Sequence, residues 1–238
     1  MNSKNLFFDL DRTLWDFDTN SEIALNQLFF ELDLHQKIDQ FHDFHTVYKE
    51  TNARLWKLYG SGQLKKEVLR IERFREALEK FQVTDVELVK KLSDGYVELS
   101  PQQTTLFPNT IETLEDLKKS GYNMHIITNG FKEVQSVKLN KSGLDTYFDV
   151  IVCSEDVGKN KPSAEIFHFS MQKANTLAKE SVMIGDDYEV DVQGALKVGM
   201  SGILFDPGKT KFKSQEEHLI YELNELPDLL PWVFRTIP

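Results

Sequence analysis

The chain has 238 residues, 40% of them hydrophobic, and its 28 lysines and arginines against 38 aspartates and glutamates leave a formal charge of −10. This hydrophobic content excludes wholesale disorder and can fill the core of one or two domains. So acidic a surface repels nucleic-acid polymers and anionic membranes, and no run approaches the ~20 apolar residues of a membrane span. Cys153 is the only cysteine, so no intrachain disulfide is possible. We therefore predict a cytoplasmic protein with neither a nucleic-acid nor a membrane partner.

Five short apolar runs have the length, the β-branching and the flanking turn residues of buried strands. They cover residues 5–10, 124–128, 150–153, 182–184 and 202–205. Helical patterns of crossover length separate the later runs, at residues 109–121, 163–175 and 190–198. Continuously apolar strands that alternate with helices are typical of a parallel sheet covered on both faces. The sequence thus predicts an α/β fold with a doubly wound, Rossmann-like core.

The interval between the first two predicted strands is far longer than one crossover and has a helical pattern nearly throughout. Capping-box spacing, in which a polar residue precedes a glutamate by three positions, marks three predicted helix starts. These pairs are Thr19 with Glu22, Thr84 with Glu87, and Asn109 with Glu112. We predict an inserted all-helical domain at residues 15–100, which leaves residues 1–14 and 101–238 to the α/β core.

The insert also contains a run of basic residues interleaved with glutamates. The run comprises Lys65, Lys66, Arg70, Arg73 and Arg75. Because opposite charges three or four positions apart stabilise a helix surface, we predict that the run forms an exposed helix face. A contact between some of these cations and a substrate is the alternative.

Polar residues follow the predicted strands at their carboxyl ends. They are Asp9, Asp11 and Thr13 after the first strand, Thr128 and Asn129 after the second, Lys161 after the third, and Asp186, Asp187 and Asp191 after the fourth. In open parallel sheets, ligands bind outside the carboxyl ends of the strands, where the strand order reverses. If the order is 3-2-1-4-5, then Asp9, Asp11 and Asp186 converge at one place.

Several carboxylates in one crevice raise one another's pKa unless a cation balances them, and oxygen ligands of this kind suit Mg²⁺. The hydroxyl of Thr128, the backbone N–H of Asn129 and the ammonium group of Lys161 complete a set that can bind a phosphoryl group. We predict that Asp9 is the nucleophile and Asp11 the general acid and base. Asp187 and Asp191 have an alternative role as residues of a first helical turn.

Four motifs in this order resemble those of the haloacid dehalogenase superfamily. They are Asp9-x-Asp11-x-Thr13, Thr128-Asn129, Lys161-Pro162 and Gly185-Asp186-Asp187-x-x-x-Asp191. The position of the insert between the first two motifs is similar to that of a C1-type cap. The resemblance implies phosphoryl transfer through a phosphoaspartate on Asp9. It also implies Mg²⁺ held by the Asp9 side chain, the Asp11 backbone carbonyl and Asp186, with Thr128 and Lys161 on the phosphoryl group and Asp187 and Asp191 in support.

Within the superfamily, dehalogenases lack the second aspartate of the first motif, so Asp11 favours phosphatase chemistry. Residues 9–21 resemble the pyrimidine 5′-nucleotidase branch, with one departure at Arg12, where glycine is commoner. The resemblance implies a Mg²⁺-dependent 5′-nucleotidase that hydrolyses a small phosphorylated metabolite. A sugar-phosphate phosphatase or phosphomutase on the same core, and a non-catalytic protein that binds a phosphorylated ligand, are the alternatives.

Overall fold

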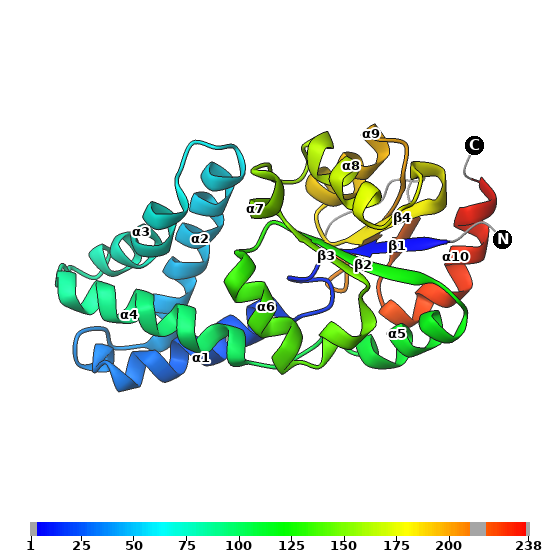
Figure 1. Ribbon diagram of the computed structural model, residues 1–238. Helices are drawn as coiled ribbons and strands as arrows, with labels where there is room; N and C mark the ends of the chain where they lie inside the picture. Colours follow the sequence, from blue (N-terminus) through cyan, green and yellow to red (C-terminus); the bar gives the residue numbers. More distant parts are fainter. Residues whose placement is uncertain (1–3, 210–217, 237–238) are drawn as a thin grey trace. The chain divides into compact units, whose positions relative to one another are not determined.

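The computed structural model describes residues 4–209 and 218–236 of the chain. The chain divides into two compact units, Met1–Phe17 with Thr104–Pro238 and Asp18–Gln103, which we call the core and the cap (Figure 1). The divisions follow residues 17 and 103, where the sequence predicts them after residues 14 and 100. Residues 1–3, 210–217 and 237–238 of the predicted core lie outside the described ranges.

Within the described residues, the core contains a six-stranded parallel sheet in the order β3-β2-β1-β4-β5-β6. The strands are β1 (Asn5–Phe8), β2 (Asn123–Thr128), β3 (Val150–Cys153), β4 (Ser181–Gly185), β5 (Ser201–Phe205) and β6 (His218–Ile220). The five predicted strands and their order are confirmed. The prediction missed β6, because three residues are too few to carry a recognisable pattern.

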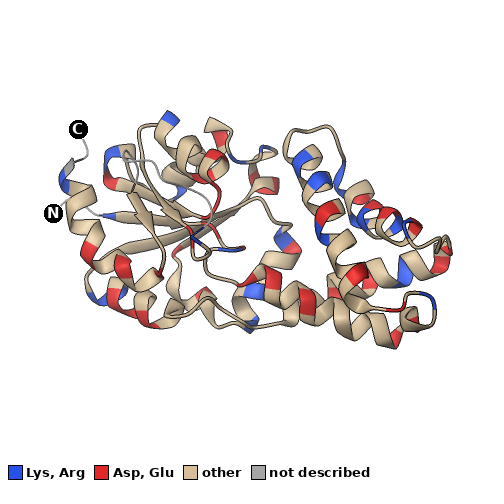
Figure 2. Ribbon diagram, turned by 180° about the vertical axis from the view of Figure 1, so that it is seen from behind, with Lys and Arg blue, Asp and Glu red and all other residues tan. Residues whose placement is uncertain are grey.

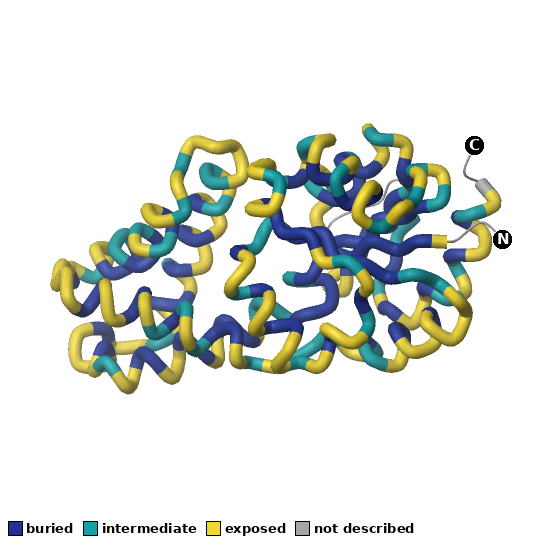
Figure 3. The backbone as a smooth tube through the Cα atoms, in the orientation of Figure 1, coloured by how far each residue is buried: buried dark blue, intermediate teal, exposed yellow. Residues whose placement is uncertain are grey.

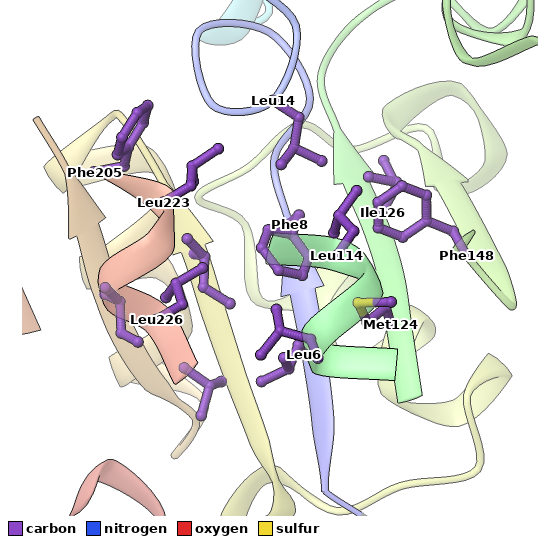
Figure 4. Close-up of a cluster of buried hydrophobic side chains, with 14 of the residues drawn as sticks. Leu6, Phe8, Leu14, Leu114, Met124, Ile126, Phe148, Phe205, Leu223 and Leu226 are labelled. Atoms are coloured by element: carbon purple, nitrogen blue, oxygen red, sulfur yellow. The ribbon is translucent and has the colours of Figure 1, made fainter. Parts of the chain in front are cut away.

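Helices cover both faces of this sheet, as its continuously apolar strands require. The helices of the core are α5 (Thr110–Lys119), α6 (Lys132–Lys141), α7 (Ser154–Val157), α8 (Ala164–Lys173), α9 (Gln193–Lys197) and α10 (Leu226–Thr236). Leu6 and Phe8 of β1 pack with Leu114 of α5 in one buried cluster (Figure 4). Phe7, between them in sequence, packs with Phe167 of α8 in a second cluster. The central strands β1, β2 and β4 are therefore buried along nearly their whole length, whereas Ile151 of the edge strand β3 is exposed (Figure 3).

The cap is helical, as predicted. Its main helices are α1 (Phe17–Glu31), α2 (Phe41–Gly60), α3 (Lys66–Glu79) and α4 (Val86–Leu99). Apolar side chains spaced three and four positions apart meet in its interior, among them Leu25 and Phe29 of α1, Phe44 of α2, Phe74 of α3 and Leu92 of α4. In the described part of the chain, every helix is too short or too polar to cross a bilayer.

The predicted capping boxes do not form. Helix α1 begins at Phe17, so Thr19 lies inside it. Asp85 rather than Thr84 caps α4, and its carboxylate accepts a hydrogen bond of 3.1 Å from the backbone N–H of the third helical residue. Asn109 precedes α5 in the left-handed conformation, and its side chain makes no capping hydrogen bond. The spacing alone does not separate a cap from an exposed pair inside a helix.

Both signs of charge are distributed along the cap helices (Figure 2). Arg75 pairs with Glu72 and Glu79, in agreement with the predicted exposed face of α3. The prediction is wrong for Arg73, which is only 4% exposed. Its Nη1 atom donates a hydrogen bond of 3.4 Å to Oδ1 of Asn52 on α2, because this face of α3 turns toward the interior of the cap.

Candidate active site

The ends of three neighbouring strands carry the predicted site residues. Asp9 and Asp11 follow β1, Thr128 ends β2, and Asp186 follows β4. The backbone N–H of Asp9 donates to the carbonyl oxygen of Ile184 in β4 at 2.9 Å, which extends the strand pairing by one residue. Because β1 lies between β2 and β4, the sheet order brings these residues to the same edge, where the strand order reverses.

Lys161 is a buried cation of this site, with an exposed fraction of 2%. Its Nζ atom lies 2.6 Å from Oδ1 of Asp9, 2.7 Å from Oδ1 of Asp191 and 2.7 Å from the carbonyl oxygen of Ile127. All three ammonium protons therefore have acceptors. Burial alone would lower the pKa of Lys161, but the carboxylates of Asp191 and Asp9 raise it above its ordinary value. The side chain therefore stays charged.

The side chain of Asn129 holds the segment that carries Lys161. Its Oδ1 accepts a hydrogen bond of 2.7 Å from the backbone N–H of Lys161, and its Nδ2 donates one of 3.0 Å to the carbonyl oxygen of the same residue. Both polar atoms of the amide are thus committed to the Lys161 backbone. The group of Asn129 that remains for a substrate is its backbone N–H.

Asp9, Asp186 and Asp191 form an acidic cluster, in which each offers a carboxylate oxygen within 4.8 Å of those of the other two. Burial raises the pKa of Asp9 well above its ordinary value, and the negative charges of Asp191 and Asp186 raise it further, against the opposing effect of Lys161. One ammonium group does not balance three carboxylates. Because all the ligands are hard oxygen atoms, the donor set fits a divalent cation such as Mg²⁺.

The glycine that ends β4 is required by space. A Cβ atom at Gly185 would lie 2.2 Å from Oδ2 of Asp191, so the carboxylate occupies the place of a side chain. The same oxygen accepts a hydrogen bond of 3.1 Å from the backbone N–H of Asp187. A π-helical turn, η5 (Tyr188–Val192), carries Asp191 back to this position, and α9 follows it. The predicted helix at 190–198 is therefore two elements.

The carboxylate of Asp11 is bound by a different pair of residues. Its Oδ1 lies 2.5 Å from Nζ of Lys138, and its Oδ2 accepts a hydrogen bond of 2.8 Å from Nε2 of Gln135. Both donors come from α6, and neither is among the site residues predicted from the sequence. The buried residues of α6 are Gln135, Lys138 and Leu139, so its buried face is mostly polar and carries no apolar periodicity.

The chain matches the profile of the haloacid dehalogenase-like hydrolases over residues 6–205. It belongs to this family. It is 31% identical to pyrimidine 5′-nucleotidase YjjG of Escherichia coli over 197 residues, which cover 82% of the chain and 83% of YjjG. It is 32% identical to glyceraldehyde 3-phosphate phosphatase of Pyrococcus furiosus over 233 residues, which cover 95% of the chain and 91% of that enzyme.

The structure of this hydrolase resembles a solved one with a TM-score of 0.86 and 26% sequence identity, over 97% of the chain and 100% of the other. That structure is of YfnB from Bacillus subtilis, a protein named as a HAD-hydrolase and crystallised with magnesium bound. The predicted resemblance to the superfamily is confirmed, and the similarity to YjjG agrees with a nucleotidase-like branch.

Three further motif residues of the hydrolase have local roles. The Asp187 carboxylate accepts two backbone hydrogen bonds of 3.0 Å and caps η5, one position before the first helical turn in which the alternative interpretation places it. Thr13 is fully buried, and its hydroxyl has no hydrogen-bond partner among the described residues. Arg12 has a φ of 64°, a conformation that glycine adopts more readily, and its guanidinium group lies 4.4 Å from the ring centroid of Phe17.

Proposed function

We propose that this hydrolase is a Mg²⁺-dependent phosphatase that cleaves nucleoside monophosphates through an aspartyl-phosphate intermediate on Asp9. The observation that carries the proposal is the position of the Asp9 carboxylate. It contacts Lys161 and belongs to the acidic cluster, at the end of a strand whose neighbour ends in Thr128. A carboxylate nucleophile beside a fixed cation and hydrogen-bond donors meets the needs of phosphoryl transfer.

The groups around Asp9 match the charge of a phosphoryl group. The hydroxyl of Thr128 and the backbone N–H of Asn129 are its proposed hydrogen-bond donors, and the ammonium group of Lys161 supplies a fixed positive charge beside it. A magnesium ion held by the side chains of Asp9 and Asp186 and the backbone carbonyl of Asp11 would supply the remaining positive charge. Because Lys161 is held by three acceptors before any substrate binds, its charge needs little reorganisation in the transition state.

The carboxyl groups of Asp9 and Asp11 have different roles in the proposed reaction. An oxygen of Asp9 attacks phosphorus while the bond from phosphorus to the leaving oxygen breaks, and the carboxyl group of Asp11 gives that oxygen a proton. Water then attacks the phosphorus of the aspartyl phosphate and gives a proton to the Asp11 carboxylate. Inorganic phosphate leaves, Asp9 is free again, and Asp11 regains the proton that it lost.

The substrate class is proposed from the relatives. Similarity to YjjG over most of both chains supports a nucleoside monophosphate. Similarity to the glyceraldehyde 3-phosphate phosphatase, also over most of both chains, supports the second candidate, a phosphatase of small sugar phosphates. Both classes are alkyl phosphates, so the chemistry at Asp9 is the same and only the leaving group differs.

A substrate panel tests the proposal. Phosphate release is measured with Mg²⁺ on pyrimidine and purine nucleoside monophosphates, hexose phosphates and glyceraldehyde 3-phosphate, and compared as kcat/KM. We expect the highest values for nucleoside monophosphates. A preference for sugar phosphates would replace the substrate class, and a folded enzyme that releases phosphate from none of them would contradict the phosphatase itself.

The D9N variant and metal removal test the mechanism. Asparagine keeps the shape of Asp9 but does not attack phosphorus, so kcat should fall roughly 10⁴-fold or more while circular dichroism stays unchanged. The exposed Asp228→Asn change on α10 is the matched control. EDTA should abolish turnover by the wild-type enzyme, and Mg²⁺ should restore it. Substantial turnover by folded D9N would exclude Asp9 as the nucleophile.

A further inference from the structure

Helix α6 presents two buried polar side chains on one face. Gln135 and Lys138 are three positions apart, so they lie on the same side of the helix. Gln135 is fully buried, and Lys138 is 3% exposed. Burial of an amide and an ammonium group is unfavourable unless each is hydrogen-bonded or paired, so the contacts that these side chains make are informative.

Each side chain binds one oxygen of the Asp11 carboxylate. The distances are 2.5 Å from Nζ of Lys138 to Oδ1 and 2.8 Å from Nε2 of Gln135 to Oδ2. Nζ of Lys138 also lies 4.1 Å from the ring centroid of Trp15, which is fully buried. The ammonium group therefore lies between the face of the Trp15 ring, with which it makes a cation–π contact, and the Asp11 carboxylate, with which it forms an ion pair. The side chain of Asp11 is therefore held at both oxygens.

Gln135 also orients the hydroxyl group of Thr128. Its Nε2 donates to Oγ1 of Thr128 at 2.7 Å, and the backbone N–H of Gly130 donates to the same oxygen at 3.1 Å. A hydroxyl oxygen has two lone pairs, and both are now used. The Thr128 proton must therefore point away from these donors, so the hydroxyl is a hydrogen-bond donor to whatever lies at the strand end.

Two further observations show that the Gln135 amide is placed for these contacts. A Cβ atom at Gly130 would lie 2.1 Å from Nε2 of Gln135, so only glycine leaves room for the amide. The Oε1 atom of Gln135 is buried and has no hydrogen-bond partner among the described residues. The opposite orientation of the amide would place Oε1 against the Asp11 carboxylate, where two acceptors would repel each other. The observed orientation keeps both hydrogen bonds of Nε2 and leaves Oε1 unsatisfied, which is unfavourable.

We propose that Gln135 and Lys138 are positioning residues for phosphoryl transfer. They hold the Asp11 carboxyl group in one place for proton transfer to the leaving oxygen, and Gln135 turns the Thr128 proton toward the phosphoryl group. The inference rests on the proposed phosphatase reaction and adds two residues to it. Without this grip, Asp11 samples other rotamers and meets the leaving oxygen less often, which slows the step that needs a proton.

Leaving groups of different basicity test the inference. An alkyl phosphate, such as the best substrate of the panel, leaves as a strongly basic oxygen that needs a proton, whereas p-nitrophenyl phosphate leaves as a stable phenolate. In K138M, kcat on the alkyl phosphate should fall about 10²-fold, and kcat on p-nitrophenyl phosphate less than about fivefold. K138R should restore part of the loss, because it keeps the charge and the donors. Lys141→Met, at an exposed position one turn further along α6, is the matched control.

A double-mutant cycle with D11N separates positioning from a general effect on the fold. If Lys138 acts through Asp11, K138M should not slow D11N further on the alkyl phosphate. Q135L, which removes the other donor to Asp11, should reproduce the selective loss and also raise KM for both substrates through Thr128. It serves as the second variant should K138M fail to fold.

Two kinds of failure are distinguishable. Variants that lose both substrates equally, that slow D11N further, or that hydrolyse the alkyl phosphate as fast as or faster than wild type would overturn the positioning role alone. Wild-type enzyme that releases phosphate from neither substrate would overturn the proposed phosphatase, and the inference with it.

Discussion

The core and the cap bury positive charge in different ways. In the core, Lys161 contacts the carboxylates of Asp9 and Asp191, and Lys138 contacts that of Asp11. In the cap, the buried guanidinium group of Arg73 contacts uncharged groups. These are Oδ1 of Asn52 at 3.4 Å and the rings of Phe74 and Tyr96, whose centroids both lie 4.9 Å from it.

This difference shows which buried charges depend on one another. Removal of a lysine from the core leaves negative charge in a buried place, whereas removal of Arg73 from the cap leaves an amide and two aromatic rings. A buried carboxylate that loses its cation destabilises the folded state far more than do uncharged groups that lose the same cation. The buried lysines of the core are therefore held by ion pairs, whereas Arg73 of the cap is held by packing and one hydrogen bond to an amide.

The largest effect should come from paired substitutions of these cations. K161M leaves Asp9 and Asp191 without their buried cation, so the free energy of unfolding should fall by about 3–5 kcal/mol. R73M leaves no carboxylate behind, and the same quantity should change by less than about 1 kcal/mol. Urea unfolding in EDTA, followed by circular dichroism, measures both, because no metal ion then compensates the carboxylates. Equal losses in the two variants would break the comparison.

Two glycines test the comparison between core and cap by steric crowding rather than by charge. In G185A, the new Cβ atom would lie 2.2 Å from the Asp191 carboxylate and displace it, and a shift of this kind should lower kcat about 10²-fold. In G60A, at the end of α2, the new atom has no neighbour within 4 Å. That variant should keep full activity and gain up to about 1 kcal/mol of stability, since alanine restricts the unfolded chain. Normal turnover by G185A would mean that Asp191 tolerates displacement.

The smallest effect concerns a histidine of the core. Nε2 of His125 lies 3.1 Å from the acceptor Oδ1 of Asn5, so Nε2 carries the proton, and Nδ1 is buried without a hydrogen-bond partner. Protonation of Nδ1 would bury a second N–H group with no acceptor. Burial accordingly lowers the pKa of His125 to about 4, below its usual 6.5.

Between pH 6.5 and 4, the unfolded chain therefore binds a proton that the folded chain does not bind. The free energy of unfolding should fall as the pH falls through this window, by up to about 1 kcal/mol per pH unit. The H125Q variant should show a shallower loss in urea titrations at each pH. In the cap, burial lowers the pKa of His45 but the charge of Glu22 opposes it, so H45Q should change the slope less. Identical slopes in wild type and H125Q would contradict the role of His125.

Much of the core was predictable because it follows from strand order. Its strands are continuous apolar runs, and in a parallel sheet the residues after neighbouring strands must meet at one edge. Asp9 and Asp186 come together for this reason, although most of the chain, residues 10–185, lies between them. Lys161 was predictable only as a residue after the third strand, since its contacts depend on the amide of Asn129.

The buried polar residues of the helices could not be predicted, because their burial produces no periodic pattern of hydrophobicity in the sequence. Gln135 and Lys138 lie on the buried face of a helix, where patterns of hydrophobicity place apolar residues. Arg73 has the sequence context of a surface cation, and its burial depends on rings from two helices. The helix start at Asn109 is confirmed, since α5 begins at the next residue, but Thr19 lies inside α1, and Asp85 rather than Thr84 caps α4. Those two positions were wrong for a simpler reason, since a threonine three positions before a glutamate occurs inside exposed helices as readily as at their ends.

The central place of β1 has a consequence for synthesis on the ribosome. This strand is translated before its neighbours, yet its pairing partners at residues 123–126 and 181–184 follow the entire cap. The continuous segment 18–103 can fold while it emerges, whereas Leu6, Phe7 and Phe8 must wait for residues far along the chain. Contacts so distant in sequence form slowly, since a long loop must first close. For most of translation, the nascent chain therefore exposes an unpaired apolar strand, which is the segment that a chaperone would have to shield.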